Sequence, residues 1–367
     1  MEETTLSIKR PLYEASTQFR NWRYSPEQLS EIRTSLNNAA VGVIRTTFEA
    51  QELGSSTIVS FLTPDEERLL VKLYVTKITQ LCGLFRFPEE VEATAASYLK
   101  RFYLKNTVMD WHPKNVMYVT RHRNISTNPW SRRLTALFLA TKTTNNPISL
   151  EAYTTHIPKT APSDVLDLEF LVAQSLGFEF SVWHPHRALW GMWLDLQSLP
   201  DCPVDLRHVY DIALNYIRAS RLTDAELIYT PSQIALAALS LAAPELATTW
   251  SRHKMQGEGA PLLLSNDAIS VIVEGVKNLI ITTGVIPDVE SVREVDKRLR
   301  LCKNPEKVVG SAAYIAKKAE NERIAEEKRN KKAEDIRRAV ADSDPFGDEL
   351  TGQSAGLVDY DDDDDDD

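Results

Sequence analysis

Apolar residues recur at helical spacing along much of this chain. After Thr63 the steps between successive apolar positions are four, four, three and four residues, at Leu70, Tyr74, Ile78, Leu81 and Phe85. This spacing places the side chains on one face of an α-helix, whereas a half-buried strand would alternate every second residue. No convincing alternating run bounded by Asn-Gly or Asp-Gly turns accompanies it. The pattern predicts an all-α fold.

A recurring signal marks where helices are expected to begin. Residues 25–28, 63–66 and 230–233 share the order Ser or Thr, Pro, any residue, Glu or Gln, and residues 223–226 have the same order without proline. In such a capping box the hydroxyl accepts a hydrogen bond from the third helical amide, and the Glu or Gln reaches back to the amide of the cap residue. Proline fits the first helical position because no hydrogen bond is lost there.

The chain also contains an internal repeat. Residues 98–117 align without gaps on residues 216–235, an offset of 118. The matched pairs are Tyr98 with Tyr216, Lys100 with Arg218, Leu104 with Leu222, Trp111 with Tyr229, Pro113 with Pro231 and Val116 with Ile234. In each copy one apolar helix ends and an X-Pro step opens another. The repeat favours a duplication, and it predicts two helical domains of similar design, over 61–183 and 184–286.

Segments of different character flank these two domains. Residues 1–60 are expected to form an N-terminal extension with a helix near 26–38. Residues 287–341 are expected to form charged C-terminal helices, because 311–341 hold nine basic and six acidic residues and too few apolar ones to build a core. Residues 342–367 are expected to be a disordered acidic tail.

The charge of the protein is concentrated in that tail. The 42 Lys and Arg residues against 52 Asp and Glu give a net charge of −10, and the eight aspartates of 359–367 leave the rest of the chain at −2. A nearly neutral body argues against a protein that mainly grips a nucleic-acid backbone. No apolar run approaches the roughly 18 residues of a membrane helix, and the N-terminus lacks the apolar core of a signal peptide. Neither a membrane nor secretion is expected.

Sequence signatures of catalysis are missing. The nucleotide-binding, zinc-protease and serine-hydrolase motifs do not occur. Cys82, Cys202 and Cys302 lie far apart, which fits a reducing compartment better than a disulfide or zinc framework. The His184-Pro-His186 pair lacks a third ligand and is better explained as a linker. We therefore expect no catalytic residue, no cofactor and no metal site, and a protein that is not an enzyme.

Several segments resemble the cyclin box. These are ASYLKRFYLKNTVMDWHPKNVM (96–117), ALFLATKT (136–143) and DLEFLVAQSLGFEF (167–180) in the first domain, and RLTDAELIYTPSQIALAAL (221–239) in the second. The segment FRNWRYSPEQLSEIR (19–33) is similar to the N-terminal helix of cyclin H and the tryptophan before it. The similarity spans about residues 18–285 and points to the cyclin H family, of fungal type. It implies two consecutive five-helix cyclin boxes with extra N- and C-terminal helices.

The resemblance also implies which residues bind a kinase. Cyclins pair a lysine of the third helix with a glutamate of the fifth, and these match Lys142 and Glu169. Leu139, Phe178 and Phe180 match the hydrophobic pocket that receives the regulatory helix of the kinase, and Trp22 belongs to the N-terminal part of the same surface. From the residues alone, the three apolar side chains could be ordinary core and the ion pair a surface contact worth about 0–1 kcal/mol. The resemblance favours the kinase surface.

The function that the resemblance implies is regulatory. The cyclin would bind and activate the cyclin-dependent kinase of the CDK-activating kinase (CAK) complex. That complex phosphorylates kinase activation loops and, within TFIIH, the C-terminal domain of RNA polymerase II. The implied partners are the kinase subunit, a RING-containing assembly factor and the TFIIH core, in the nucleus; ATP and magnesium belong to the kinase. No membrane or direct nucleic-acid contact is expected.

Two other interpretations remain open at this point. Another transcription-associated cyclin, of the C, K, T or L type, would share the Lys142–Glu169 pair but take a different kinase. A TFIIB-like factor with the cyclin fold would bind nucleic acid, but it should have basic domains and usually a zinc ribbon, which this chain lacks.

One stretch of the first domain has no counterpart in the second. Residues 121–135 carry four arginines and Pro129, which would break a helix. They are expected to form a loop that interrupts the third helix, or to be translated from a retained intron. In both cases they affect how Leu139 and Lys142 are presented.

Overall fold

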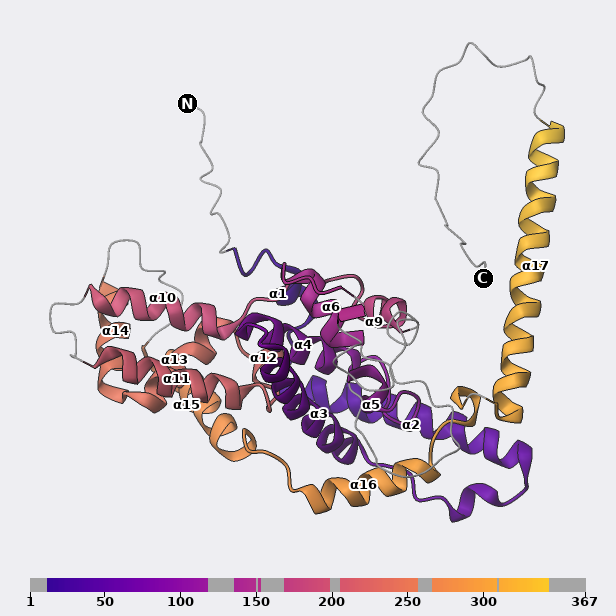
Figure 1. The fold of residues 1–367 in the computed structure, drawn as a ribbon, viewed down its shortest axis with the longest axis horizontal. Coiled ribbons are helices and arrows are strands. Elements are labelled where there is room, and N and C mark those ends of the chain that lie inside the picture. The colour runs from indigo at the N-terminus through magenta and orange to yellow at the C-terminus, as the bar shows by residue number, and fades with distance from the viewer. Residues whose placement is uncertain are drawn as a thin grey trace, which may run out of the picture. The chain divides into compact units, whose positions relative to one another are not determined.

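Every regular element in the described part of the chain is a helix (Figure 1). The structure, a computed structural model, describes residues 12–117, 135–149, 151–152, 168–198, 205–256, 266–308 and 310–342. It divides into two compact units, Met1–Lys307 and Val308–Asp367. The expected all-α fold is confirmed.

The three capping boxes that contain proline form as expected. They open α2 (Pro26–Gln51), α3 (Pro64–Phe85) and α13 (Pro231–Ala242), and in each box both hydrogen bonds are made. The box expected at 223–226 does not form, and α12 (Ala225–Ile228) begins there without a side-chain cap. Glu226 lies instead 2.8 Å from Lys100 Nζ and accepts a hydrogen bond from Ser97 Oγ. That prediction was wrong because a contact between the domains takes the side chain that would complete the box.

The first domain is built around a buried helix. Its described helices are α3, α4 (Glu89–Phe102), α5 (Pro113–Met117), α6 (Thr135–Thr143) and α9 (Glu169–Ser175). Residues 135–141 of α6 are all buried, and α6 packs against α4, α5 and α9. The insertion expected at 121–135 lies outside the described residues except for Thr135, which is not in a loop but begins α6.

The second domain repeats this design around α13. Its other helices are α10 (Pro185–Gln197), α11 (Leu206–Ser220), α14 (Pro244–Gln256) and α15 (Asn266–Thr283), together with the single turn of α12. Helix α13 packs against α10, α11, α14 and α15. Three of its buried residues are alanines, at 235, 237 and 238, and small side chains allow the surrounding helices to approach closely. Within its described residues, the domain therefore has five main helices with the most apolar one at its centre.

The offset of 118 found in the sequence holds for the helices. Helix α4 ends at Phe102 and α11 ends at Ser220, while α5 begins at Pro113 and α13 begins at Pro231. Each pair of positions is separated by 118 residues. The repeated segments thus occupy equivalent places in the two domains.

The N-terminal extension is more helical than its sequence indicated. It contains α1 (Thr17–Asn21), α2 and a short 3₁₀ turn at Ser55–Ile58. Helix α2 runs to Gln51 and not to about residue 38, because no proline interrupts residues 39–51 and Ile44 is buried in the core of the first domain. Near its start, Leu29 packs with Leu104 of the first domain and Leu227 of the second. The long helix therefore braces both domains.

The segment expected to hold charged helices, 287–341, falls into two different parts. Helix α16 (Val289–Leu301) buries Val292, Val295 and Leu299 in the core of the first domain, and a 3₁₀ turn at Pro305–Lys307 follows. It is thus a structural part of the first unit. The low apolar content noted in the sequence belongs to residues 311–341, whereas α16 carries an apolar face at helical spacing.

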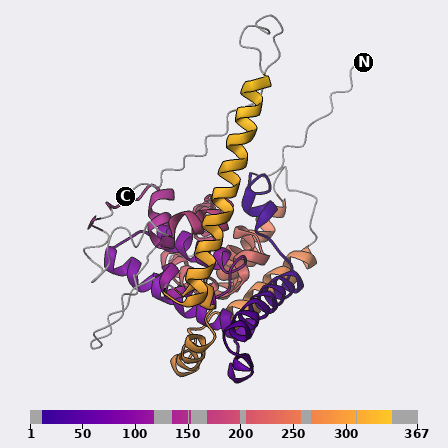
Figure 2. The same ribbon diagram turned by 90° about the vertical axis from the view of Figure 1, so that its right-hand side faces the viewer.

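Helix α17 (Ala312–Asp342) belongs to the second unit. It is one long helix without a kink in either view (Figures 1 and 2), and exposed ion pairs such as Lys318–Glu322 line it. The expected acidic tail at 342–367 lies outside the described residues, except for Asp342 at the end of this helix. Among the described helices, none combines the length and apolar content needed to cross a bilayer.

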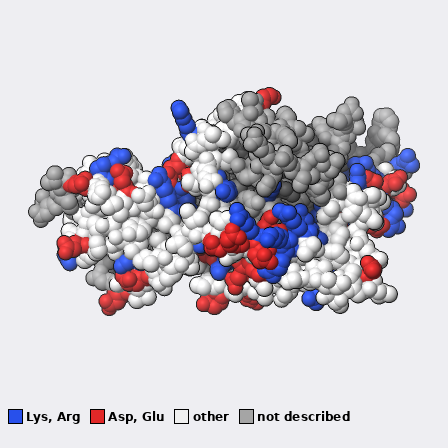
Figure 3. All heavy atoms as spheres, turned by 60° about the horizontal axis from the view of Figure 1, so that its bottom comes forward, with Lys and Arg blue, Asp and Glu red and all other residues white. Residues whose placement is uncertain are grey.

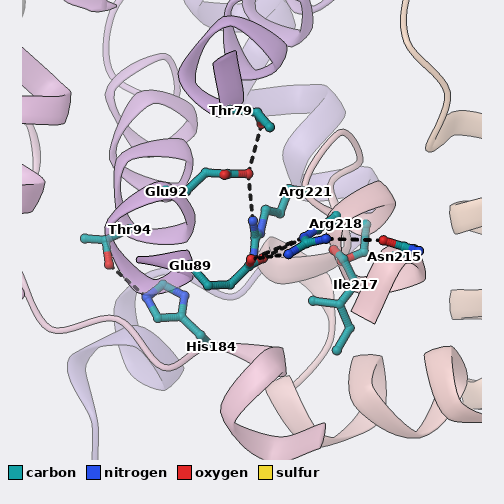
Figure 4. A network of polar contacts seen from close by, with 10 residues as sticks. Thr79, Glu89, Glu92, Thr94, His184, Asn215, Ile217, Arg218 and Arg221 are labelled. Carbon is teal, nitrogen blue, oxygen red and sulfur yellow. Dashed lines mark hydrogen bonds and ion pairs between the residues drawn. The ribbon is translucent and has the colours of Figure 1, made fainter. Parts of the chain in front are cut away.

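A cluster of ion pairs joins the two domains (Figure 4). Glu89 and Glu92 of α4 face Arg218 and Arg221 at the end of α11. Arg218 Nη2 lies 2.7 Å from Glu89, and Arg221 contacts both carboxylates, with its Nη1 2.8 Å from Glu92. Thr79 of α3 also donates to Glu92. We call these four charged residues the interdomain clamp.

Candidate partner-binding site

The expected lysine–glutamate pair is present at the surface of the first domain. Lys142 lies in the last turn of α6 and Glu169 is the first residue of α9, and Lys142 Nζ donates to Glu169 Oε1 at 2.7 Å. The ammonium also lies 4.7 Å from the centre of the Phe138 ring, a favourable cation–π distance. Lys142 remains 44% exposed. Two residues that are 27 positions apart in sequence, each on its own helix, thus form one accessible ion pair.

Leu139 lies one helical turn before Lys142, but its side chain is only 5% exposed. It packs in the core of the first domain with residues such as Val172 and Leu176 of the α9 region. Leu139 therefore contributes little to the surface of the free protein. Its contact with a partner remains a prediction.

Aromatic side chains flank the ion pair. Phe178 is 55% exposed and Phe180 is partly buried, and their rings meet edge to face with centroids 6.4 Å apart. Phe170, which was not among the residues expected from the sequence, is 68% exposed and lies 6.1 Å from Phe178. Together with Lys142 and Glu169, these three phenylalanines form what we call the α6–α9 surface.

Phe170 could have been found from the spacing of apolar residues in α9. The three most deeply buried residues of this helix region are Leu168, Val172 and Leu176, four residues apart. Phe170 falls midway between two of them and therefore on the opposite side of the helix. An outward aromatic residue becomes informative when it joins a contiguous apolar patch, as Phe170 does with Phe178.

The end of α9 explains how Phe178 is turned outward. Phe178 N–H donates to Ala173 and Gly177 N–H to Gln174, the two hydrogen bonds of a Schellman motif. Gly177 has φ +61°, as glycine readily does, but Phe178 follows with φ +58°. A bulky residue with a left-handed backbone is rare and strained. The exposed ring is thus held in place at an energetic cost.

A buried tyrosine connects this turn to α6. Tyr98 OH donates to the carbonyl of Phe180 at 2.6 Å and lies 2.9 Å from Thr143 Oγ1, next to Lys142. Burial, opposed by a hydrogen bond to Thr143 and by the charge of Arg101, raises the pKa of Tyr98 to about 12. The hydroxyl therefore keeps its proton at physiological pH and remains a donor.

Trp22 does not lie on the α6–α9 surface. It is 4% exposed and packs with Leu29, Leu104 and Leu227. Its indole Nε1 donates to Glu179 Oε2 at 2.6 Å, and Glu179 directly follows Phe178. Trp22 thus reaches the site through Glu179.

The two histidines of the linker are structural. His184 Nε2 lies 2.8 Å from Thr94 Oγ1 and its ring stacks on that of His186. Burial, reinforced by the charge of Arg221, lowers the pKa of His186 to about 4, so this ring is neutral at physiological pH. No group of three or more potential metal ligands occurs among the residues that the structure describes.

Comparison with known proteins identifies the family. Residues 184–281 match the model of the cyclin C-terminal domain. The cyclin mcs2 of Schizosaccharomyces pombe is 30% identical over 339 residues, which cover 90% of this chain and 97% of that protein. The chain belongs to the cyclin family. The relationship expected from the cyclin-box segments is confirmed, and the two helical domains are its cyclin boxes.

Solved structures resemble this cyclin over most of its length. A chain of the CAK complex from Chaetomium thermophilum, bound to ATP-gamma-S, has a TM-score of 0.68 and 27% identity, covering 93% of this chain and 98% of that one. A chain of the yeast TFIIK complex of Kin28, Ccl1 and Tfb3 has a TM-score of 0.55 and 29% identity, covering 73% and 100%. At these identities the likeness to the two matched chains extends beyond a shared fold to their sequences.

On the face drawn in Figure 3, acidic and basic side chains of the described residues lie intermixed. A protein that tracks a phosphate backbone presents a stripe or patch of basic charge, and this face does not present one.

Proposed function

We propose that this cyclin binds and activates the cyclin-dependent kinase of a CDK-activating kinase complex. The observation that carries the proposal is the α6–α9 surface, in which an accessible Lys142–Glu169 ion pair lies beside two exposed phenylalanines. Relatives in the CAK and TFIIK complexes support the choice of kinase. Such a cyclin acts as a regulatory subunit and supplies no catalytic residue.

Phe170 and Phe178 would serve as the apolar anchors of the interface. Both rings are largely exposed in the free protein, so a partner that covers them gains their burial. Large aromatic side chains at the centre of an interface often carry most of its binding energy. An apolar face of a kinase helix is the kind of partner that such anchors fit.

The ion pair would orient that helix. Lys142 has three N–H donors and uses one of them on Glu169, so the others can donate to backbone carbonyls of the kinase. Glu169 holds the long lysine side chain in one position, which lowers the entropy lost on binding. Leu139, just beneath, would complete the contact when the surface is covered.

Activation would follow from differential binding. In protein kinases a glutamate of the regulatory helix must pair with the phosphate-binding lysine. A cyclin that binds the inward position of that helix better than the outward one shifts the kinase toward the active state, by no more than that difference. The α6–α9 surface would make this distinction because its anchors are fixed on two packed helices.

The wider setting extends the same proposal. A RING-containing assembly factor would complete the complex; the yeast TFIIK complex likewise contains Tfb3 beside Kin28 and Ccl1. Within TFIIH, in the nucleus, the complex would phosphorylate the C-terminal domain of RNA polymerase II, and it would also phosphorylate kinase activation loops.

Reconstitution with the kinase subunit and the assembly factor tests the function. Wild-type cyclin should stimulate phosphorylation of a polymerase-tail peptide. The double variant Phe170→Ala/Phe178→Ala should weaken kinase binding at least tenfold, about 1.4 kcal/mol. Both side chains are exposed, so circular dichroism should show an unchanged fold.

A matched control removes exposed apolar side chains elsewhere. Trp190→Ala/Leu194→Ala alters two exposed residues of α10 in the second box and should leave kinase binding within twofold of wild type. An equal loss of kinase binding in both double variants would show that the interface does not lie at the α6–α9 surface. A wild-type protein that fails to bind the kinase would refute the proposed function.

A further inference from the structure

The strained turn at Phe178 needs external support. A left-handed backbone at a bulky residue persists only where the surrounding structure fixes it. Phe178 itself is more than half exposed, so its own side chain is not packed firmly enough to do this. The support must come from contacts made by neighbouring residues.

Glu179, the residue after Phe178, supplies part of that support. Its Oε1 accepts a hydrogen bond from Asn21 Nδ2 at 2.5 Å and its Oε2 accepts one from Trp22 Nε1 at 2.6 Å. Its backbone carbonyl also accepts from Arg101 Nη1 at 3.4 Å. Both carboxylate oxygens are therefore held by the N-terminal segment, which lies more than 150 residues earlier in the chain.

The first box supplies a second contact, two residues after Phe178. The carbonyl of Phe180 accepts from the buried Tyr98 hydroxyl. Phe178 is therefore followed by two anchored residues. The N-terminal segment holds the carboxylate of Glu179, whereas side chains of α4 hold the carbonyls of Glu179 and Phe180. Of these contacts, those to the Glu179 carboxylate come from a segment outside the cyclin boxes.

Trp22 reaches the turn through its hydrogen bond to Glu179. The Arg101 guanidinium lies 4.9 Å from the centre of its ring, and the ring is almost completely covered. The indole N–H is the only hydrogen-bonding group of the side chain, and Glu179 accepts it. The covered ring offers almost no surface of its own to a partner.

We propose that Asn21, Trp22 and Glu179 are positioning residues that hold the 177–180 turn in the conformation that presents Phe178 to the kinase. This inference rests on the proposed function, because it assigns Phe178 its partner. The N-terminal segment then controls kinase affinity without contacting the kinase. If the turn relaxes, only a fraction of the cyclin presents Phe178 correctly, and the apparent dissociation constant rises by the inverse of that fraction.

Hydrogen exchange in the free cyclin tests the positioning role without a kinase. Trp22→Phe keeps an aromatic ring against Arg101 but removes the N–H donor, and Asn21→Ala removes the other donor at an exposed position. Both variants should raise the exchange rate of the Phe178 and Glu179 amides at least tenfold. Amides of the central helix α13 should be unchanged. Trp190→Phe, a tryptophan change on the second box, is the matched control and should have no effect on the turn.

A double-mutant cycle then tests the route of action. Trp22→Phe and Phe178→Ala should each weaken kinase binding about fivefold or more. The double variant should bind the kinase no more than twofold more weakly than Phe178→Ala alone. Without the Phe178 ring, the positioning residues have nothing left to present. A change that merely destabilised the fold would add its effect to that of Phe178→Ala, since independent effects are additive.

The outcomes separate the two proposals. Unchanged exchange at Phe178 and Glu179 in both the Trp22 and the Asn21 variant would overturn the positioning role whatever the kinase data show. Full additivity in the cycle would overturn it as well. A wild-type cyclin that binds no kinase, with faster exchange in the variants, would refute the proposed function and leave the positioning residues to serve another partner.

Discussion

Phe178 shows how single residues define the surface of this cyclin. Its ring is exposed because the backbone at Gly177 and Phe178 turns into the left-handed region after α9. The glycine adopts this conformation at little cost, whereas an L-residue with a side chain is destabilised there by roughly 1–2 kcal/mol. Leu139, by contrast, is almost completely covered although it lies one turn from Lys142.

A pair of glycine substitutions tests the turn. Gly177→Ala should lower the free energy of unfolding by about 1 kcal/mol, because alanine is strained at a φ of +61° although its methyl group would meet no other atom within 4 Å. Gly191→Ala is the control in the middle of α10, where the methyl group also has open space. It should raise the free energy of unfolding by about 0.5–1 kcal/mol. Urea denaturation measures both, and a neutral Gly177→Ala would show that the turn is not held left-handed.

At the scale of elements, α16 shows that a charged helix can be part of a core. Only its three residues Val292, Val295 and Leu299 are deeply buried, at the three- and four-residue spacing of one helical face. Side-chain contacts add to this packing, including a hydrogen bond at 2.8 Å between Asp296 and His112 of the first box. The helix thus completes the first box although it follows the second in sequence.

Two leucine substitutions in α16, one on its buried face and one at its exposed end, test the role of this helix. Leu299→Ala should lower the free energy of unfolding by about 3 kcal/mol, because it leaves a cavity in the core of the first box. Leu301→Ala alters an exposed leucine two residues later, and it should change the free energy of unfolding by less than about 0.5 kcal/mol. Thermal or urea unfolding of the full chain gives both values. Similar small effects for the two would mean that α16 is not docked on the first box in solution.

At the scale of the whole first unit, the interdomain clamp sets how the boxes are joined. Burial disfavours the charged form of Glu89, but hydrogen bonds and the charges of Arg218 and Arg221 outweigh this and lower its pKa to about 2. Arg221 is itself largely buried and contacts Glu89 and Glu92. A charge held in this way is costly to leave without its partner.

The interdomain clamp predicts a defined dependence on pH. Because the pKa of Glu89 is lower in the folded state than in the unfolded chain, its contribution is complete above about pH 4.5 and is lost as the pH falls toward about 2. Glu89→Gln should therefore be less stable than wild type by about 2 kcal/mol at pH 7. This difference should shrink steadily below pH 4.5, as followed by urea unfolding at several pH values.

Glu90 provides the matched control for this measurement. It neighbours Glu89 on α4 but pairs with the exposed Arg187. Glu90→Gln should therefore lower the free energy of unfolding by only about 0–1 kcal/mol at pH 7. A stability difference between Glu89→Gln and wild type that stays constant down to pH 2 would contradict the role assigned to Glu89.

What the sequence determined by itself was mostly local. The proline-containing capping boxes placed the starts of α2, α3 and α13, because a capping box involves residues only three apart. The offset of 118 located the equivalent helices of the two boxes, since a duplicated segment keeps its helix signals. Lys142 and Glu169 needed the resemblance to cyclins, because no local rule joins residues on different helices.

Only the tertiary structure decided which side chains are covered and which distant residues meet. It buried Trp22 and Leu139, exposed Phe170, and brought Glu179 to Trp22 across 157 positions of the chain. It also diverted Glu226 from a local cap to Lys100 of the other box. Burial and long-range pairing depend on how whole helices pack against one another, and the periodicity of one segment does not specify which face of a neighbouring helix it will meet.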